Sequence, residues 1–304
     1  MKNIPVSLKY IIEEFRKTLT DNYEQTEIMQ FIYLLCEEWL GWNKAEVQLN
    51  KEKVMKGEEV NRFWDALEQL NANKPIQYII GVTHFLDLKI SVRKGVLIPR
   101  PETEELTAMI LLDYQHRKYE RFAVLDIGTG SGCIPLAVKK QMPGTDVTGL
   151  DISTVALEIA SENAQLNSCD VRFIKADILD RNIWKDFPGY TIITSNPPYI
   201  TDNERSIMHA NVLEYEPYEA LFVRNEDPLL FYKAIAEFAF IHLIRPGTLY
   251  LEINELYGKQ IQELLISIGF ERVDLLKDIH GKNRFIRAEA KTTMLDSSYW
   301  NVEH

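Results

Sequence analysis

The segment Asn196-Pro197-Pro198-Tyr199 combines groups that could bind and orient a substrate nitrogen. It follows an apolar, β-branched run at 191–195, and its two prolines end that run because neither has an N–H to donate to a strand. The side-chain oxygen of Asn196 and the backbone carbonyl of Pro197 can each accept one N–H of an NH₂ group. Tyr199 offers a flat ring for stacking on a planar amide or base. The alternative is a turn with no chemical role.

A second candidate segment, VLDIGTGSG at 124–132, places an acid and three glycines after another apolar run. Glycines let the backbone turn sharply and approach a ligand closely. The spacing is G-x-G-x-G, which differs from the dinucleotide fingerprint, and no Walker-type Gly-Lys-Ser/Thr is present. A tight connection without a ligand is the alternative. We predict that five residues of this loop bind a cofactor: Gly128, Thr129, Gly130, Ser131 and Gly132.

Two further acids end the next two predicted strands. Asp151 follows the glycines by about 20 residues, a position from which a carboxylate can accept both hydroxyls of a ribose. Asp177 ends the third strand, where an adenine ring would lie, and with Ile178 it could hold that ring by polar and apolar contact. Each acid could instead cap a helix. Because ligands of open α/β sheets bind at the carboxyl ends of strands, we expect these residues and Asn196 to face one crevice.

Strands and helices alternate from about residue 120 onward and would position these residues. Helical stretches separate most of the predicted strands, which indicates an α/β fold with a parallel-rich sheet covered on both faces. The predicted strands lie near FAVLDI, DVTGLDI, DVRFIKA, YTIITS, TLYLEI, FERVDLL and NRFIRAEA. The segment IPRPETEEL at 98–106 predicts a helix start, because Pro101 suits the first helical position and the following acids suit the positive end of a helix.

The first ~80 residues predict a small helical bundle. Apolar residues recur at helical spacing in three stretches that short polar connections separate. The three stripes are Leu8, Ile11, Ile12, Phe15 and Leu19; Ile28, Phe31, Ile32, Leu35 and Trp39; and Val60, Phe63, Trp64, Leu67 and Leu70.

A β-hairpin is predicted between the bundle and the sheet, over residues 83–99. Apolar residues from Leu86 to Val92 alternate with polar ones, as in a half-buried strand. The sequence Arg93-Lys94-Gly95 can turn the chain, and Val96 and Ile98 can return it.

The composition limits the compartment and the class of function. The chain has 304 residues, 46% of them apolar, which is enough for two domains. No apolar run approaches the ~18–20 residues of a membrane span, and the N-terminus carries acids where a signal peptide keeps its apolar region. Cys36, Cys133 and Cys169 lack metal-ligand spacing, so we predict reduced thiols, no metal and a cytoplasmic protein. The net charge of −11 argues against a direct nucleic-acid substrate.

The order of acid, glycine loop, second acid and third acid resembles that of S-adenosylmethionine-dependent methyltransferases. The full set of motifs resembles more specifically the bacterial release-factor glutamine methyltransferases, the HemK/PrmC family. PRPETEEL and YEPYEAL discriminate better than the glycine loop and NPPY, which many methyltransferases share. The segments that carry the resemblance cover most of the chain: KPIQYIIG (74–81), LIPRPETEEL (97–106), VLDIGTGSGCIPLA (124–137), DISTVALEIASENAQLN (151–167), SNPPYI (195–200), VLEYEPYEAL (212–221) and DIHGKNRFI (278–286).

The resemblance implies transfer of a methyl group from S-adenosylmethionine to the side-chain nitrogen of the glutamine in the Gly-Gly-Gln motif of class 1 peptide-chain release factors. It implies a helical N-terminal domain, a β-hairpin and a Rossmann-like catalytic domain. We assign residues 1–80 to the bundle, 81–100 to the hairpin linker, 101–290 to the catalytic domain and 291–304 to a peripheral tail. Since the bundle carries no chemical motif, we expect it to dock the substrate.

The family's site residues map onto positions already singled out. Its cofactor-binding positions correspond to Gly128 to Gly132, Asp151, Ile178 and Asn196, and we add Asp177 from its place at the third strand end. Its substrate-binding motif corresponds to Asn196, Pro197, Pro198 and Tyr199. An amide nitrogen is a poor nucleophile because its lone pair is delocalised, so it must be held in line with the methyl group. We predict that Asn196, Pro197 and Tyr199 are the catalytic residues that do so.

Three alternatives remain. Ribosomal-protein glutamine methyltransferases share the fold and NPPY, but they tend to carry Ser-Pro-Ile-Ala where this chain has Pro101-Glu102-Thr103-Glu104. A nucleic-acid adenine N6-methyltransferase could use NPPY on an exocyclic amine, although the chain lacks a basic recognition region. A non-catalytic cofactor-binding module would be expected to have lost the loop or NPPY. Two segments depart from the usual family pattern, FVRNEDPLL (222–230) and LEINELYGKQ (251–260). These departures affect the expected geometry of the local loops and not the expected reaction.

Overall fold

The computed structural model describes residues 4–290 of the chain, which divide into two units. The helical unit contains residues 4–83 with Val92–Lys94 and Met208–Glu216. The sheet unit contains His84–Ser91, Gly95–Ile207 and residues 217–290. Each unit has its own hydrophobic core. The tail predicted at 291–304 lies outside the described residues.

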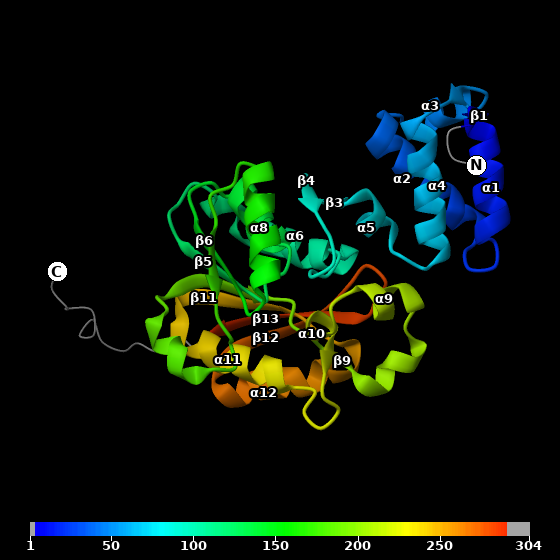
Figure 1. The fold of residues 1–304 in the computed structure, drawn as a ribbon. Helices are drawn as coiled ribbons and strands as arrows, with labels where there is room; N and C mark the ends of the chain where they lie inside the picture. Colours follow the sequence, from blue (N-terminus) through cyan, green and yellow to red (C-terminus); the bar gives the residue numbers. More distant parts are fainter. Residues whose placement is uncertain (1–3, 291–304) are drawn as a thin grey trace. The chain divides into compact units, whose positions relative to one another are not determined.

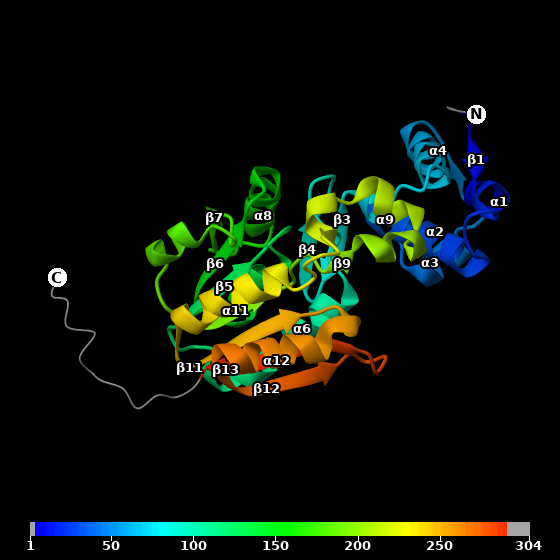
Figure 2. The same ribbon diagram turned by 90° about the horizontal axis from the view of Figure 1, so that it is seen from below.

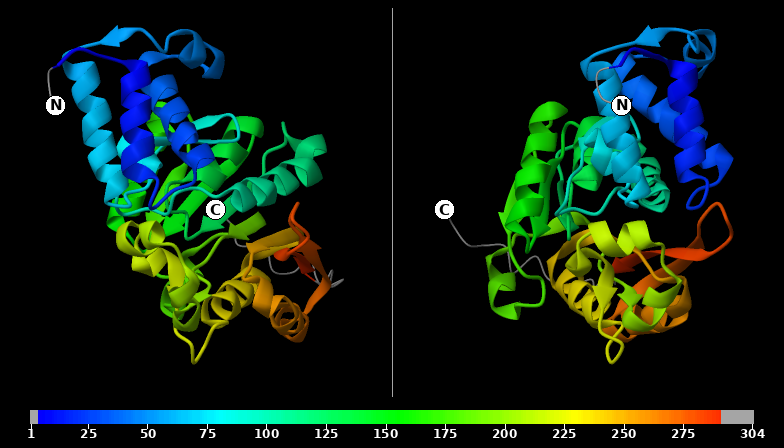
Figure 3. Two further views of the ribbon diagram at one scale, coloured as in Figure 1. Left: turned by 90° about the vertical axis from the view of Figure 1, so that its right-hand side faces the viewer. Right: turned by 45° about the vertical axis from the view of Figure 1, so that its right-hand side comes forward.

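Three amphipathic helices build the helical unit, α1 (Leu8–Leu19), α2 (Gln25–Leu40) and α4 (Glu58–Asn71), drawn in blue to cyan in Figure 3. The apolar stripes predicted from helical spacing form its core, with Trp39 partly buried against it. The prediction of a small helical bundle is therefore confirmed. The shorter elements of the unit are β1 (Val6–Ser7), α3 (Lys44–Leu49), β2 (Val54–Met55), α5 (Ile76–Ile80) and α9 (Ala210–Tyr215).

The helix α9 belongs to the helical unit although it follows the NPPY segment in the sequence. The hydroxyl of Tyr215 donates a hydrogen bond to the carbonyl of Ala72 at 2.7 Å, across a separation of 143 residues. Local sequence patterns do not indicate so distant a contact. The bundle was predicted from the first ~80 residues alone, so α9 was not predicted to belong to it.

The sheet unit is built on one seven-stranded sheet with the order β12-β13-β11-β8-β5-β6-β7. Neighbouring strands from β11 to β7 are parallel, whereas β13 runs antiparallel to both β11 and β12. The structure thus confirms a parallel-rich sheet. The strands are β5 (Ala123–Ile127), β6 (Asp146–Asp151), β7 (Arg172–Lys175), β8 (Tyr190–Ser195), β11 (Leu243–Glu252), β12 (Phe270–Lys277) and β13 (Asn283–Ala290).

Helices cover both faces of this sheet, as Figures 1 and 2 show. On one face lie α6 (Pro101–Tyr114), α7 (Cys133–Gln141) and α8 (Thr154–Leu166), and on the other α11 (Leu230–His242) and α12 (Gly258–Ile268). The prediction that α6 begins at Pro101 is confirmed. The remaining elements are α10 (Tyr218–Leu221), the short parallel pair β9 (Ile200–Thr201) and β10 (Phe222–Val223), and four 3-10 turns at Gln115–Arg117, Arg181–Asp186, Asp202–Ile207 and Glu255–Tyr257.

The predicted hairpin exists, but its turn was placed wrongly. The strands β3 (Val82–Phe85) and β4 (Leu88–Ser91) pair with each other, and the chain reverses between them at Leu86, which has a φ of 48°. The stretch Arg93-Lys94-Gly95 therefore does not form the hairpin turn, and residues 96–100 form no strand. The apolar alternation ran through the real turn and concealed it.

Two amide side chains, Asn163 of α8 and Asn167 at its C-cap, bind backbone groups of β4 where a further strand would otherwise pair. Asn163 accepts a hydrogen bond from the backbone N–H of Ser91 at 2.7 Å and donates to the carbonyl of Ser91 at 3.0 Å. Asn167 donates to the carbonyl of Lys89 at 2.9 Å. These amides replace the ladder that a returning strand would supply. Asn163 also donates to the carbonyl of Ser131 at 3.0 Å and thereby supports the glycine loop.

Within residues 4–290, no helix combines the length and the apolar character that crossing a membrane requires.

We expect Asn163→Ala to lower the free energy of unfolding by about 2–4 kcal/mol, because three hydrogen bonds of a buried side chain are lost at once. Urea unfolding followed by circular dichroism measures this difference. Gln165→Ala is the matched control, since Gln165 lies exposed on the same helix. Equal stability of the two variants would show that Asn163 does not hold β4 and the glycine loop.

Candidate active site

The candidate residues follow four neighbouring strands of the sheet at their carboxyl ends. The parallel registers pair Ile127 of β5 with Leu150 of β6 and with Ser195 of β8, and they pair Asp151 with Lys175 of β7. The strands therefore end at the same level. The structure places the glycine loop, Asp151, the pair Asp177 and Ile178, and the NPPY segment along one edge. This edge is where open α/β sheets bind ligands.

The three glycines of the loop have different surroundings. All have positive φ values, 73° at Gly128, 53° at Gly130 and 80° at Gly132, which other residues adopt at a cost. A Cβ at Gly130 would meet nothing within 4 Å, and one at Gly128 would meet only the carbonyl oxygen of Asn196, at 4.0 Å. A Cβ at Gly132 would lie 3.1 Å from Ala160 of α8. Thus the first two glycines face open space, and the third permits close packing.

The side chains of Thr129 and Ser131 are buried. Both residues were predicted to bind a cofactor as part of the loop, and their burial leaves mainly the backbone for that role. The backbone N–H groups of Gly128 and Thr129 already donate to the carbonyl of Leu150, at 2.8 and 2.9 Å. These bonds hold the loop against the end of β6.

Asp151 is tied to the same loop. One carboxylate oxygen accepts a hydrogen bond from the N–H of Gly130 at 2.8 Å, and the other accepts from the N–H of Ser153 at 2.9 Å. Burial raises the pKa of the Asp151 carboxyl, and these backbone hydrogen bonds lower it in part. The N-cap of α8 is Ser153, so Asp151 is not the helix cap that its position also allowed. Each carboxylate oxygen has a second lone pair, which can accept a ligand hydroxyl.

Asp177 and Ile178 lie next to each other beyond β7 but differ in exposure. Asp177 is half-buried, and one of its carboxylate oxygens accepts from the N–H of Leu179 at 2.9 Å. Ile178 is only 7% exposed and belongs to the core cluster that includes Trp184, whose indole N–H donates to the Ile178 carbonyl at 2.9 Å. The Ile178 side chain can therefore offer a ligand only a small part of its surface.

The structure adds Asp126, which was noted in the sequence but not predicted as a binding residue. It is 1% exposed, and among the described residues its carboxylate oxygens lack a hydrogen bond of full geometry, although the buried Thr129 hydroxyl lies near enough to interact with them. Burial raises the pKa of the Asp126 carboxyl to about 8; the Thr129 hydroxyl lowers it in part, and the charge of Asp151 adds to the rise. An unpaired buried carboxyl is costly unless a ligand completes it. Its place directly before the glycine loop was the available sequence signal.

The NPPY segment is anchored at both of its polar side chains. The amide nitrogen of Asn196 donates to the hydroxyl oxygen of Thr103 at 3.1 Å. The hydroxyl of Tyr199 donates to Glu252 at 3.0 Å, and Asn254 donates to the Tyr199 carbonyl at 3.1 Å. Burial and the nearby charge of Glu252 raise the pKa of Tyr199 well above its ordinary value, so its hydroxyl stays protonated and acts as a donor.

Sequence reasoning missed Thr103 and Glu252. Thr103 donates to Glu252 at 2.7 Å, although the two residues are 149 positions apart. Burial raises the pKa of Glu252 to about 7, against the hydrogen bonds from Thr103 and Tyr199 and the charge of Arg284, which lower it. Both residues lie in stretches that had drawn attention for other reasons, PRPETEEL as a family motif and LEINELYGKQ as a departure. Nothing in their spacing indicates that they meet.

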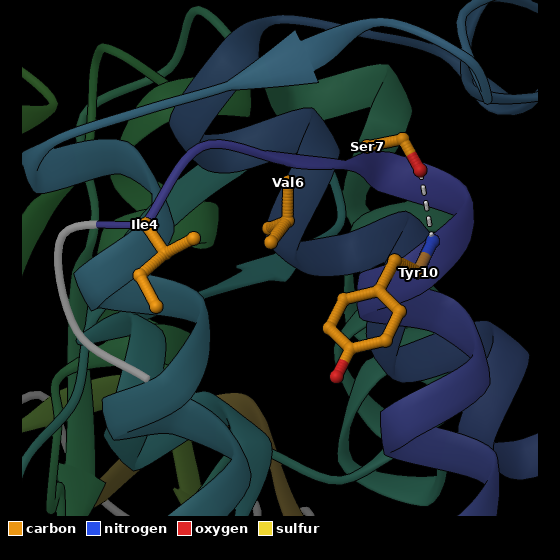
Figure 4. A pocket seen from close by; sticks show the side chains of 4 residues that line it. All are labelled: Ile4, Val6, Ser7 and Tyr10. Carbon is orange, nitrogen blue, oxygen red and sulfur yellow. Dashed lines mark hydrogen bonds between the residues drawn. The ribbon is translucent and has the colours of Figure 1, made fainter.

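The described residues hold no group of three or more His, Cys, Asp or Glu side chains that could bind a metal ion. One pocket lies in the helical unit and is lined by Ile4, Val6, Ser7 and Tyr10 (Figure 4). The hydrogen bond drawn there, from the N–H of Tyr10 to the Ser7 hydroxyl at 3.2 Å, is the N-cap of α1. None of the strand-end residues lines this pocket, so it is no part of the candidate site.

Two family models match the chain, a methyltransferase small domain at residues 105–216 and a PrmC N-terminal domain at residues 11–81. A release factor glutamine methyltransferase of Flavobacterium psychrophilum is 40% identical over 90% of this chain and 96% of its own length. One of the same name from Bacteroides thetaiotaomicron is 38% identical, with coverage of 90% and 96%. A solved release factor-specific protein-(glutamine-N5) methyltransferase from Alicyclobacillus acidocaldarius shares 25% identity, with a TM-score of 0.40 and coverage of 66% of this chain and 99% of that chain.

Asp126 yields a prediction about pH. Its pKa is about 8 in the folded protein and ~3.9 in an unfolded chain. The stabilisation from its protonated form is therefore complete below pH ~4 and is lost as the pH rises to about 8. Between pH 5 and 8 we expect the free energy of unfolding to fall by about 3–4 kcal/mol more in the wild type than in Asp126→Asn.

Chemical unfolding at pH 5 and pH 8, without ligand, measures the difference. Titrating groups that do not interact with Asp126 are common to both proteins and cancel in the comparison. Asp21→Asn, at an exposed site of the helical unit, is the control and should keep the wild-type dependence on pH. The same dependence in Asp126→Asn would contradict the assignment of a buried, unpaired carboxyl.

Proposed function

The chain belongs to the release factor glutamine methyltransferases, and we propose that it methylates the side-chain nitrogen of the glutamine in the Gly-Gly-Gln motif of class 1 peptide-chain release factors. One observation carries this proposal: Asn196, whose amide is held by a buried network, lies beside the open face of the glycine loop. The backbone carbonyl oxygen of Asn196 lies 4.0 Å from the point that a Cβ on Gly128 would occupy. A ligand held by the loop and a nitrogen held by NPPY would therefore be neighbours.

We propose S-adenosylmethionine as the methyl donor, and the strand-end residues fit its parts. The unpaired carboxyl of Asp126 suits the donor's ammonium group, and the second lone pairs of Asp151 suit its ribose hydroxyls. We propose that Asp177 and the small exposed part of Ile178 hold the adenine, because both follow the carboxyl end of β7. The residues from Gly128 to Gly132 and Asn196 complete the proposed cofactor set. Bound S-adenosylmethionine supplies a methyl group on a positively charged sulfur, which keeps the bonding electrons when the methyl group leaves.

The NPPY segment would prepare the nitrogen that receives the methyl group. We propose that the side-chain oxygen of Asn196 and the backbone carbonyl of Pro197 each accept one N–H of the glutamine amide. This fixes the direction of the nitrogen's lone pair, and the two oxygens favour the positive charge that develops there. Pro198 stiffens the segment, and the ring of Tyr199 packs beside the planar amide. The nitrogen becomes cationic as its bond to carbon forms and then releases one proton to water, so no dedicated base is needed.

The identity of the substrate rests on the family. The relatives with which this chain shares 40% and 38% identity are named for release factors, and the chain spans 96% of the length of each. We extend that substrate to this chain and place the activity in the cytoplasm, where translation terminates. We further propose that the helical unit docks the release factor, because that unit carries none of the strand-end residues. The net charge of −11 is unfavourable for binding naked nucleic acid.

The test is mass spectrometry of purified substrates after incubation with enzyme and S-adenosylmethionine. We expect one added methyl group on the Gly-Gly-Gln glutamine of a release factor, and none when that glutamine is replaced by alanine or glutamate. An ionised glutamate has no N–H to donate and would face two acceptor oxygens in a desolvated site. Preferential labelling of a ribosomal protein or of adenine-containing DNA under the same conditions would overturn the proposal.

Asn196→Ala is the control that ties the labelling to this site. We expect it to lower the methylation rate by about 10²–10³, the cost of removing one hydrogen bond made to developing charge. Calorimetry with S-adenosylmethionine verifies that the variant is folded and gives the concentration that saturates it, since Asn196 also belongs to the proposed cofactor set.

A further inference from the structure

Thr103 and Glu252 join the two polar side chains of NPPY from outside the motif. Thr103 is the third residue of α6, and Glu252 is the last residue of β11. They are 3% and 1% exposed. One oxygen of Glu252 accepts from Thr103 at 2.7 Å, and the other accepts from Tyr199 at 3.0 Å. Thr103 in turn accepts from Asn196 at 3.1 Å.

The chemistry of this chain of bonds gives it a direction. Burial raises the pKa of Glu252 to about 7, and in the ionised form that prevails above this pH the carboxylate has no hydrogen to donate and only accepts. The single hydroxyl hydrogen of Thr103 is therefore committed to Glu252, and Thr103 can meet Asn196 only as an acceptor. It follows that the NH₂ end of the Asn196 amide must face Thr103.

The two ends of an asparagine amide are almost identical in shape, so packing alone does not select between its two orientations. Hydrogen-bond partners must make that selection. With its NH₂ end bound to Thr103, Asn196 turns its oxygen to the other side. A reversed amide would place an NH₂ group against the NH₂ group of the target glutamine, where neither could accept.

We propose that Thr103 and Glu252 are positioning residues for methyl transfer, which fix the Asn196 amide so that its oxygen receives the target nitrogen; this inference rests on the function proposed above. Neither residue needs to touch the substrate. Glu252 accepts the hydroxyl hydrogen of Thr103, and the Thr103 oxygen accepts from the NH₂ end of Asn196. The oxygen of the Asn196 amide is thereby left to face the target nitrogen. The same carboxylate holds the hydroxyl of Tyr199, so one buried charge orients both polar side chains of the motif.

Two variants at Thr103 separate this role from a role in packing alone. Thr103→Val keeps the shape and loses the hydroxyl, whereas Thr103→Ser keeps the hydroxyl and loses a methyl group. If Thr103 merely fills space, Val should be the better replacement. If it orients Asn196, kcat should fall by at least about tenfold in Thr103→Val, up to the ~10²–10³ of a lost direct hydrogen bond, and Thr103→Ser should recover most of it.

Thr107→Val is the matched control for removing a buried hydroxyl from α6. The Thr107 hydroxyl donates to the backbone carbonyl of Thr103 at 2.8 Å and has no part in the network to Asn196. We expect its kcat to stay within about twofold of the wild type. Calorimetry should give the same Kd for S-adenosylmethionine, within about twofold, in all four proteins. Equal kcat values for Thr103→Val, Thr103→Ser and Thr107→Val would overturn the proposal.

A second measurement needs no substrate and therefore separates this inference from the proposed function. In ¹⁵N-labelled protein, the side-chain NH₂ signals of Asn196 are identified by their absence in Asn196→Asp. Their exchange with solvent should be slow in the wild type and in Thr103→Ser, and faster in Thr103→Val. Equal exchange in the three proteins would refute the positioning role. A wild type that leaves release factor unlabelled would refute only the proposed function, and the kcat comparison would then use the substrate that it does label.

Discussion

The buried carboxyl of Glu252 adjoins the candidate active site, and in its ionised form it accepts hydrogen bonds only, which fixes the direction of the hydrogen bonds around it. Glu252 ends β11 beside β8, where the register pairs Leu251 with Ser195, so its side chain reaches the level of Asn196. Its burial raises its pKa to about 7, which makes the ionised form costly. That cost is offset by two hydroxyl donors, Thr103 and Tyr199. The hydroxyl hydrogens of Thr103 and Tyr199 therefore point to Glu252, and the Thr103 oxygen is left to accept from the amide of Asn196.

Near the glycine loop, too, a buried carboxyl that is costly to the folded protein lies where a ligand is proposed to bind. Asp126 is buried with no hydrogen bond of full geometry among the described residues, and two glycines beside it face open space. In the ligand-free protein this arrangement is destabilising, because a buried carboxyl lacks its donors. A cationic donor molecule would supply them. Asn163 binds the backbone of both β4 and the glycine loop and thereby holds the loop in place.

The sequence sufficed for features that depend on neighbouring residues. The glycine loop, Asp151 and Asn196 follow strands whose apolar runs are plain, and parallel strands bring their carboxyl ends to one edge. Features that depend on distant side chains were not predictable. The apolar alternation ran through the real hairpin turn and concealed it, and nothing near Ser91 indicates that Asn163, 72 residues away, binds its backbone in place of a returning strand. Thr103 and Asn196 are 93 residues apart, and nothing in the sequence around either residue indicates that the two form a hydrogen bond.

The central claim is that NPPY holds an amide nitrogen between two oxygens whose orientation Glu252 imposes. The most direct test is a crystal structure of the protein with S-adenosylhomocysteine and an unmethylated release factor. The account predicts that the target glutamine nitrogen lies within ~3.2 Å of both the Asn196 side-chain oxygen and the Pro197 carbonyl, with Thr103 bound to the opposite end of the Asn196 amide. A glutamine nitrogen held by other groups, or an Asn196 amide detached from Thr103 in that complex, would contradict it.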